Sequence, residues 1–215
     1  LAITDAAVNI APDLSAKAAI LQHAIDLMAS IGVDLPKAAI LSAVETVNPL
    51  ISSSLDAAAL SVMSHRGQVR GALVDGPLAF DNAISLKAAE VKGIASPVAG
   101  DADILLVPDL VSGNILAKSL EYMADATLAG LVLGLNAPIV LPSRADPVDA
   151  RLAGLALARL SLAAKARESA PQDKAPVWPV HATRSSPMPE VDCCPPSDPT
   201  PTSPTSLNGG AHAEP

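Results

Sequence analysis

The feature that most constrains this chain is an alternation of short apolar runs with segments of helical periodicity, which continues up to about Ala170. Apolar runs without a polar face are typical of strands buried on both sides, and helices between such strands indicate a mostly parallel sheet with helices on both faces. We therefore expect an α/β fold. The expected strands are Ala38–Leu41, Gly71–Val74, Asp103–Val107 and Pro138–Leu141, and the expected helices are Ser15–Ile31, Leu55–His65, Ile115–Ala129 and Pro147–Ala166.

The composition changes where this alternation ends. Eleven of the 20 prolines lie between Pro171 and Pro215, mixed with Ser, Thr and Asp. Such a segment has too little apolar surface to offset the conformational entropy that is lost on ordering. We therefore expect one folded domain over residues 1–168 and a disordered tail over residues 169–215.

Charge and composition argue against several classes of partner. The formal net charge is −8 and the chain holds one Phe, one Tyr and one Trp, which disfavours binding to nucleic acid. No uncharged apolar run reaches the roughly 18 residues of a membrane span, and the start has no basic segment of the signal-peptide kind. The two cysteines, Cys193 and Cys194, lie in the tail without a nearby His and make a poor zinc site. The scarcity of cysteine elsewhere fits a reducing cytoplasm.

Clusters of Gly, Pro, Asn and Asp join the expected strands to the expected helices, and three of them come directly after a strand. These three begin at Asp75, at Pro108-Asp109 and at Ser143-Arg144. In open parallel sheets, ligands bind beyond the carboxyl ends of the strands. The shared position of the three clusters therefore favours a ligand site.

Each cluster also has a purely structural interpretation. Asp75–Pro77 is a natural tight turn, and Asp81-Asn82 would cap a helix that starts near Ser85.

Two further clusters have the same two interpretations. Ser96–Gly100 is either a plain loop or a place where a ligand approaches the backbone closely. Ser112-Gly113-Asn114 is either a helix N-cap or an anion site at a helix start, with Lys118 either adding charge to that site or only solvated.

Ser143, Arg144 and Asp146 place a hydroxyl, a guanidinium and a carboxylate within one short segment between an expected strand and an expected helix. Arg can hold a phosphate through two hydrogen bonds, Ser can donate to a developing oxyanion, and Asp can accept a proton or orient the Arg. Asp146 before Pro147 is also a natural N-cap. The chain has no Walker loop and no GxGxxG motif, and its histidines do not indicate a Ser-His-Asp triad.

Taken together, these segments resemble the phosphate acetyltransferase and phosphate butyryltransferase family, and most closely its butyryltransferase-like bacterial members. The resemblance runs from Leu1 to about Leu162. The matching segments are Thr4–Asn9, Leu41–Glu45, Asp75–Leu78, Asp81–Ala83, Ser96–Gly100, Pro108-Asp109, Gly113-Asn114 with Lys118, and Ser143–Asp146.

The resemblance implies an enzyme that transfers a short acyl group, acetyl or butyryl, between coenzyme A and inorganic phosphate to give acyl phosphate. It also implies two α/β domains with the active site in the cleft between them, in a fold similar to the isocitrate and isopropylmalate dehydrogenases. Coenzyme A would be a substrate, and no metal or redox cofactor is expected. Members of the family often pair as dimers, so a homodimer is expected as well.

The resemblance also implies roles for particular residues. A carboxylate would help to deprotonate the coenzyme A thiol, which attacks the acyl phosphate carbonyl, while Ser143 stabilises the oxyanion and Arg144 holds the phosphate. The carboxylate would be Asp146 or Asp149, because Ala150 stands where acetyltransferases carry an Asp. The residues expected to bind the substrates are Asp75, Pro77, Ser96, Gly100, Asp109, Gly113, Asn114 and Lys118.

Members of the family carry a further segment before the motif at Thr4–Asn9, which supplies much of the first domain and additional phosphate-binding arginines. We therefore expect the chain to be a fragment or a truncated form. A non-catalytic remnant of the fold with an interaction or regulatory role is the alternative function. A decarboxylase on the related dehydrogenase-like fold is a third possibility, and it would require clustered metal-binding carboxylates.

Overall fold

The computed structural model of the protein describes residues 1–169. The tail expected to be disordered lies outside the described residues, apart from Ser169, which is the last residue of a helix. Within residues 1–169, no helix combines the length and the apolar character that crossing a membrane requires.

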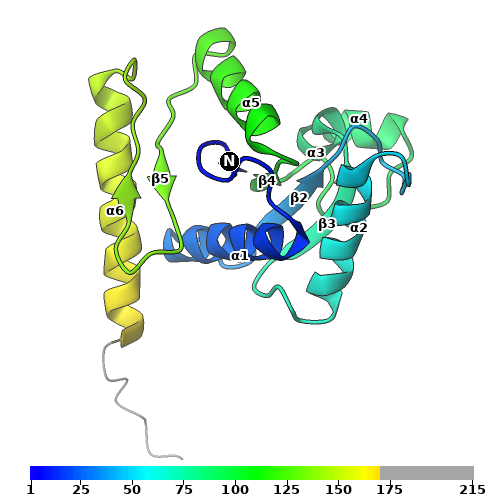
Figure 1. Ribbon diagram of the computed structural model, residues 1–215, viewed down its shortest axis with the longest axis horizontal. Helices are drawn as coiled ribbons and strands as arrows, with labels where there is room; N and C mark the ends of the chain where they lie inside the picture. Colours follow the sequence, from blue (N-terminus) through cyan, green and yellow to red (C-terminus); the bar gives the residue numbers. More distant parts are fainter. Residues whose placement is uncertain (170–215) are drawn as a thin grey trace, which may run out of the picture. The chain divides into compact units, whose positions relative to one another are not determined.

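A sheet of four parallel strands forms the centre of the described part, with the strand order β1-β4-β2-β3 (Figure 1). The strands are β1 (Ala2–Thr4), β2 (Lys37–Leu41), β3 (Leu73–Leu78) and β4 (Ile104–Leu106). Ile104 pairs with Ala2 on one side and with Ala38 on the other. The predicted strands at positions 38–41 and 103–107 are confirmed as β2 and β4, whereas the predicted strand at positions 71–74 overlaps β3 only at Leu73 and Val74. β1 was not predicted, because a run of three residues is shorter than the apolar runs that identify the other strands.

Helices cover both faces of the sheet, as predicted. α1 (Leu14–Ser30) and α2 (Ser52–His65) pack against one face, where Ile40 and Leu106 are buried with Leu21. α3 (Phe80–Ile84) and α4 (Leu86–Val91) pack against the other face, where Ala39 and Leu105 are buried. Successive side chains of a strand point to opposite faces of the sheet. Because helices cover both faces here, the side chains on each face must be apolar. This explains why the strands read as uninterrupted apolar runs.

α5 (Leu110–Met123) begins five residues before the predicted start at Ile115. Its N-cap is Asp109, whose carboxylate accepts a hydrogen bond from the backbone N–H of Ser112 at 2.8 Å. The Ser112 hydroxyl also closes a capping box with the Asp109 backbone. The cluster Ser112–Asn114 therefore lies inside the helix, close to its start. The helix ends at Met123 rather than Ala129, shortly before Asp125, whose φ of 55° is incompatible with a right-handed helix.

The predicted fourth parallel strand is wrong. Residues 138–141 contain only the short strand β6 (Ile139–Val140), which pairs antiparallel with β5 (Leu131–Val132) in a separate two-stranded ribbon. The connection between the two strands contains Gly134, whose φ of 83° allows the chain to reverse direction. β6 therefore pairs with β5, its neighbour in sequence.

α6 (Val148–Ser169) follows the ribbon and lies against it. The helix buries a narrow stripe of small residues that includes Ala150, Gly154 and Ala158. A Cβ at Gly154 would come within 2.8 Å of the Cγ1 atom of Val140, so the close approach depends on that glycine. The predicted helix at positions 147–166 is thus confirmed with small shifts at its ends.

Candidate functional site

The four parallel strands end at one edge of the sheet, and each is followed by polar residues. Asp5 follows β1, Asp109 lies three residues after β4, Ser42 follows β2, and Asn82 lies shortly after β3. Because the strands are parallel, these residues all lie at the edge where α/β proteins bind ligands.

The loop after β1 is organised by the carboxylate of Asp5. It accepts hydrogen bonds from the backbone N–H groups of Ala7 at 2.8 Å, Val8 at 2.9 Å and Asn9 at 2.7 Å, and from the Asn9 side-chain amide at 2.6 Å. Burial raises the pKa of Asp5, but the four hydrogen bonds together outweigh it and hold the pKa below its ordinary value. Asp5 was quoted for the family resemblance but was not expected in the site, because the strand before it is too short to be recognised from the sequence.

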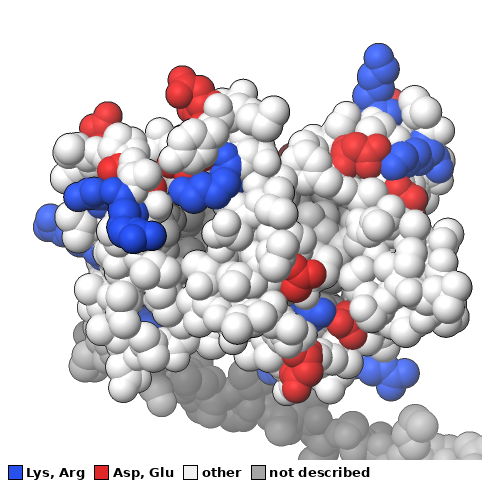
Figure 2. Space-filling model, turned by 45° about the horizontal axis from the view of Figure 1, so that its top comes forward, with Lys and Arg blue, Asp and Glu red and all other residues white. Residues whose placement is uncertain are grey.

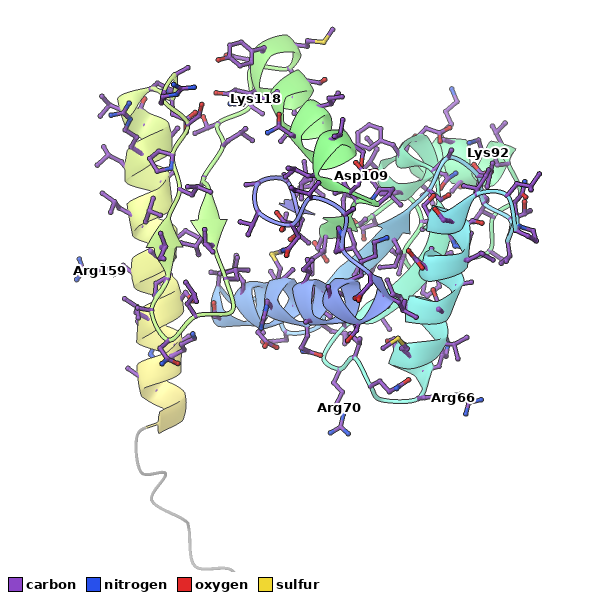
Figure 3. The ribbon with its side chains drawn as sticks, in the orientation of Figure 1. Arg66, Arg70, Lys92, Asp109, Lys118 and Arg159 are labelled. Carbon is purple, nitrogen blue, oxygen red and sulfur yellow. The ribbon has the colours of Figure 1, made fainter. Side chains whose placement is uncertain are left out.

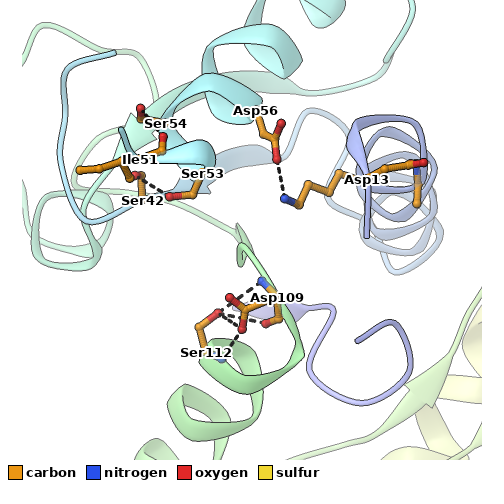
Figure 4. A network of polar contacts seen from close by, with 10 residues as sticks. Asp13, Ser42, Ile51, Ser53, Ser54, Asp56, Asp109 and Ser112 are labelled. Carbon is orange, nitrogen blue, oxygen red and sulfur yellow. Dashed lines mark hydrogen bonds and ion pairs between the residues drawn. The ribbon is translucent and has the colours of Figure 1, made fainter. Parts of the chain in front are cut away.

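The start of α5 packs against this loop. A Cβ at Gly113 would lie 2.6 Å from the carbonyl oxygen of Asp5, and the side-chain amide of Asn114 donates to the carbonyl oxygen of Ala6 at 3.3 Å. The carboxylate of Asp109 is bonded within the capping box (Figure 4). The structure thus brings Asp109, Gly113 and Asn114 together with the loop after β1, and gives each of them a local structural contact.

A second cluster joins the ends of β2 and β3. Asn82 is fully buried, and its amide donates to Glu45 at 2.6 Å. Lys92 also donates to Glu45 at 2.6 Å and lies 2.9 Å from Asp81. The hydrogen bonds from Lys92 lower the pKa of both carboxylates, and the bond to Glu45 is the main reason that the pKa of Lys92 is raised. The predicted helix cap at Asp81-Asn82 is wrong, because both residues lie inside α3 and Ser85 itself caps α4.

Two predicted substrate-binding residues, Ser96 and Gly100, adjoin this cluster. The Ser96 hydroxyl accepts from the backbone N–H groups of Val98 and Ala99 at 3.1 and 3.2 Å. The N–H of Gly100 donates to the carbonyl oxygen of Asn82 at 2.8 Å. The loop that holds Ser96 and Gly100 is therefore fastened to α3, the helix that follows β3.

Asp75 and Pro77 lie inside β3 and not beyond its end, so the predicted position of Asp75 after the strand is wrong. The strand continues to Leu78, because its pairing with β2 runs on through a shift in register between Ala39 and Leu41. The carboxylate of Asp75 accepts from the N–H of Gly76 at 2.8 Å, and Pro77 is buried.

The segment Ser143–Asp146 forms a turn that leads into α6. The N–H of Ser143 donates to Oδ2 of Asp146 at 2.7 Å, and the N–H of Asp146 donates to the carbonyl oxygen of Ser143 at 3.2 Å. The Asp146 side chain is only 7% exposed, and its Oδ1 atom lies 3.9 Å from Nζ of Lys118. Arg144 is exposed, as is Asp149 in the first turn of α6.

The predicted residues thus form two groups. α5 connects Asp109, Gly113 and Asn114 at its start with Lys118, which lies near the Ser143–Asp146 turn. Figure 3 shows Asp109 where this helix begins and Lys118 farther along it. Ser96 and Gly100 belong to the group at the end of β3. A cavity of about 500 Å³ lies elsewhere, between α1, the β5–β6 connection and α6, and none of the predicted residues lines it.

Sequence reasoning missed the ion pair between Lys17 of α1 and Asp56 of α2, whose charged atoms are 2.6 Å apart (Figure 4). The sequence does indicate that Lys17 is buried, because it falls on the same helical face as Leu21 and Met28, which are buried. Within residues 1–169, no three His, Cys, Asp or Glu side chains are grouped so as to hold a metal ion. On the face drawn in Figure 2, basic and acidic side chains are scattered among uncharged surface and do not gather into one basic patch.

These observations define the class of protein: an α/β fold with a parallel sheet covered on both faces and polar loops at its carboxyl edge. The chain belongs to the phosphate acetyl/butaryl transferase family, whose sequence model matches residues 1–158. The resemblance inferred from the motifs is therefore confirmed.

Individual relatives agree with this assignment. The chain is 62% identical over 157 residues to a phosphate acetyltransferase of Rickettsia prowazekii (strain Madrid E), which covers 73% of this chain and 45% of the relative. It is 53% identical over 156 residues to a probable phosphate butyryltransferase of Bacillus subtilis (strain 168), and this match covers 73% of this chain and 52% of the relative. Among solved structures, a branched-chain phosphotransacylase from Enterococcus faecalis V583 matches with a TM-score of 0.69 and 37% identity over 74% of this chain and 57% of that chain. The chain spans about half the length of the curated relatives it matches.

Proposed function

We propose that this chain carries the reacting half of a phosphate acyltransferase, which moves a short acyl group, acetyl or butyryl, between coenzyme A and inorganic phosphate. The observation that carries this proposal is the Ser143–Asp146 turn. It presents an exposed guanidinium beside a hydroxyl and is closed by two hydrogen bonds, in a chain of this family.

In the proposed reaction the sulfur of coenzyme A attacks the carbonyl carbon of the acyl phosphate. The new carbon–sulfur bond forms as the carbonyl electron pair moves onto oxygen, which gives a tetrahedral intermediate. This intermediate collapses as the bond from the carbon to the phosphate oxygen breaks, and phosphate leaves with that electron pair. The thiol proton passes to a carboxylate. The Ser143 hydroxyl donates to the oxyanion of the intermediate, and Arg144 holds the phosphate through two hydrogen bonds. The reverse sequence forms acyl phosphate.

Between the two candidate carboxylates, the contacts favour Asp149 as the proton acceptor. One oxygen of Asp146 holds the N–H of Ser143, and the other is buried beside Lys118. Asp149 is exposed in the first turn of α6, directly after the turn, where a thiol can approach it. A role for Asp146 in orienting the turn follows from the same contacts.

The remaining parts of the proposal come from the family. Coenzyme A acts as a substrate, the reaction requires no metal or redox cofactor, and the enzyme works in the cytoplasm of a bacterium. The fold of the complete enzyme is similar to that of the isocitrate and isopropylmalate dehydrogenases. A homodimer is part of the proposal, and exposed apolar side chains on α6 such as Leu152 and Leu155 are compatible with an assembly surface.

A non-catalytic remnant with an interaction or regulatory role is the second candidate. It is favoured by the cavity of about 500 Å³ that lies away from the predicted site residues.

Thiol release from acetyl-coenzyme A and from butyryl-coenzyme A separates the two candidates. The full chain is incubated with each donor, with and without inorganic phosphate, and the free thiol is measured. Phosphate-dependent release is the result that the acyltransferase predicts. Equal release with and without phosphate, at the rate of the buffer alone, would favour the remnant.

A further inference from the structure

Asp146 closes the Ser143–Asp146 turn with one of its two carboxylate oxygens. Its Oδ2 atom accepts from the N–H of Ser143 at 2.7 Å, and the backbone of the two residues forms a second bond at 3.2 Å in the opposite direction. The position of Ser143 and of the adjoining Arg144 therefore depends on how the Asp146 side chain is held.

The other oxygen of Asp146 is buried, and within the described part of the chain it has no hydrogen-bond partner. A buried carboxylate oxygen is costly unless a cation lies nearby. The cation in this place is Lys118 of α5, whose Nζ atom lies 3.9 Å from Oδ1. Lys118 therefore supplies the charge that makes this position of Asp146 tolerable.

The Lys118 ammonium also contacts a second carboxylate, that of Glu121. Its ammonium donates to Glu121 at 2.6 Å, the Glu121 side chain is only 13% exposed, and the ring of Tyr122 lies 5.6 Å away. The hydrogen bond to Glu121 outweighs the effect of burial and raises the pKa of Lys118, so the ammonium stays charged. Two carboxylates share one ammonium here, which leaves a local excess of negative charge that disfavours an incoming phosphate.

We propose that Lys118 is a positioning residue, which fastens the Ser143–Asp146 turn to α5 through Asp146 and does not itself bind the substrate. The consequence for catalysis rests on the proposed function, whereas the fastening of the turn does not. This assignment replaces the role in substrate binding that the sequence suggested for Lys118.

The test compares Lys118→Met with Lys118→Arg, which keeps the positive charge, and with Lys87→Met as a matched control. Lys87 is an exposed lysine on α4. Amide hydrogen exchange of Ser143 reports the turn directly, and the amides of β4 report global unfolding. Thiol release at varied phosphate concentration gives kcat and KM for each variant that is active.

Exchange of the Ser143 amide should become about tenfold faster in Lys118→Met, since a bond to a charged group is weakened, while the β4 amides stay unchanged. Lys118→Arg should restore most of the protection, and Lys87→Met should change nothing. In the kinetics, kcat should fall about tenfold and KM for phosphate should rise with it, because Ser143 and Arg144 lie on the same turn.

Two outcomes would overturn the proposal. One is an unchanged exchange rate of the Ser143 amide in Lys118→Met. The other is a raised KM for phosphate with kcat preserved, which would make Lys118 a phosphate ligand while supporting the acyltransferase function. If no variant and no wild-type protein shows phosphate-dependent release, the proposed function fails, but the exchange measurement still decides the role of Lys118.

Discussion

At the scale of single residues, the polar groups at the strand ends are engaged mainly with backbone close to them in sequence. Asp5 holds three N–H groups of its own loop, Asp109 caps its own helix, and Ser96 holds two N–H groups of the following turn. These bonds give the loops defined shapes before any ligand arrives. A side chain such as Arg144, which is exposed, is in contrast free to face a substrate.

Gly100 is a residue whose replacement should destabilise the protein. Its φ of +86° is unfavourable for other residues, and a Cβ would lie 2.5 Å from the Cα atom of Leu86. We expect Gly100→Ala to lower the free energy of unfolding by about 2–4 kcal/mol, measured by urea denaturation. Gly93→Ala is the matched control, because Gly93 has a φ of +66° but nothing within 4 Å of a Cβ, and it should cost about 1 kcal/mol. Equal losses would contradict the steric argument.

Asp5 should make stability depend on pH. The pKa of Asp5 is lowered in the folded protein, so its carboxylate stabilises the fold above the ordinary pKa of 3.8, and that contribution is lost as the pH falls through the lower folded value. Asp5→Asn should therefore cost about 1 kcal/mol of unfolding free energy at pH 7, and the difference from wild type should shrink below about pH 4. Urea denaturation at several pH values measures this. A difference that grows on acidification would contradict it.

At the scale of elements, the buried parallel strands were the most predictable part of the fold. In β2, Ala38 and Ile40 face one helix layer while Ala39 and Leu41 face the other, so all four positions must be apolar and the run stands out. The ribbon β5–β6 was not predictable in the same way. An apolar run of the same length at positions 138–141 pairs only locally, because which partner a short run takes is decided by tertiary context and not by its composition.

The packing of α1 on α2 should depend on the ion pair between Lys17 and Asp56. The Lys17 side chain is 9% exposed, so removing it leaves Asp56 partly buried without its partner. We expect Lys17→Met to lower the free energy of unfolding by about 2–3 kcal/mol, and the double variant with Asp56→Leu to recover part of that loss. Lys37→Met is the matched control, since its partner Asp101 is 80% exposed, and it should cost less than about 1 kcal/mol. Both are measured by urea denaturation, and equal losses would argue against a structural role for the buried pair.

At the scale of the whole molecule, the sequence indicated that the site lies where the strands end, but it could not show which clusters meet. Lys118 and Asp146 are far apart in sequence and are joined only because the turn before α6 lies against α5. Glu45 and Asn82 are joined in the same way at the ends of β2 and β3. Contacts of this kind arise from packing between elements, which periodicity and turn residues do not encode.

We propose that the Ser143–Asp146 turn is the site of acyl transfer, with Arg144 holding the phosphate. The most direct test is the dependence of thiol release on phosphate concentration in Arg144→Ala, compared with wild type and with Arg159→Ala. Arg159 is an exposed arginine on α6 that points away from the rest of the described chain (Figure 3). We expect Arg144→Ala to raise KM for phosphate at least tenfold, because charged hydrogen bonds worth about 1.5–3 kcal/mol each are lost, while Arg159→Ala behaves like wild type. The same KM in Arg144→Ala as in the other two proteins would contradict the claim.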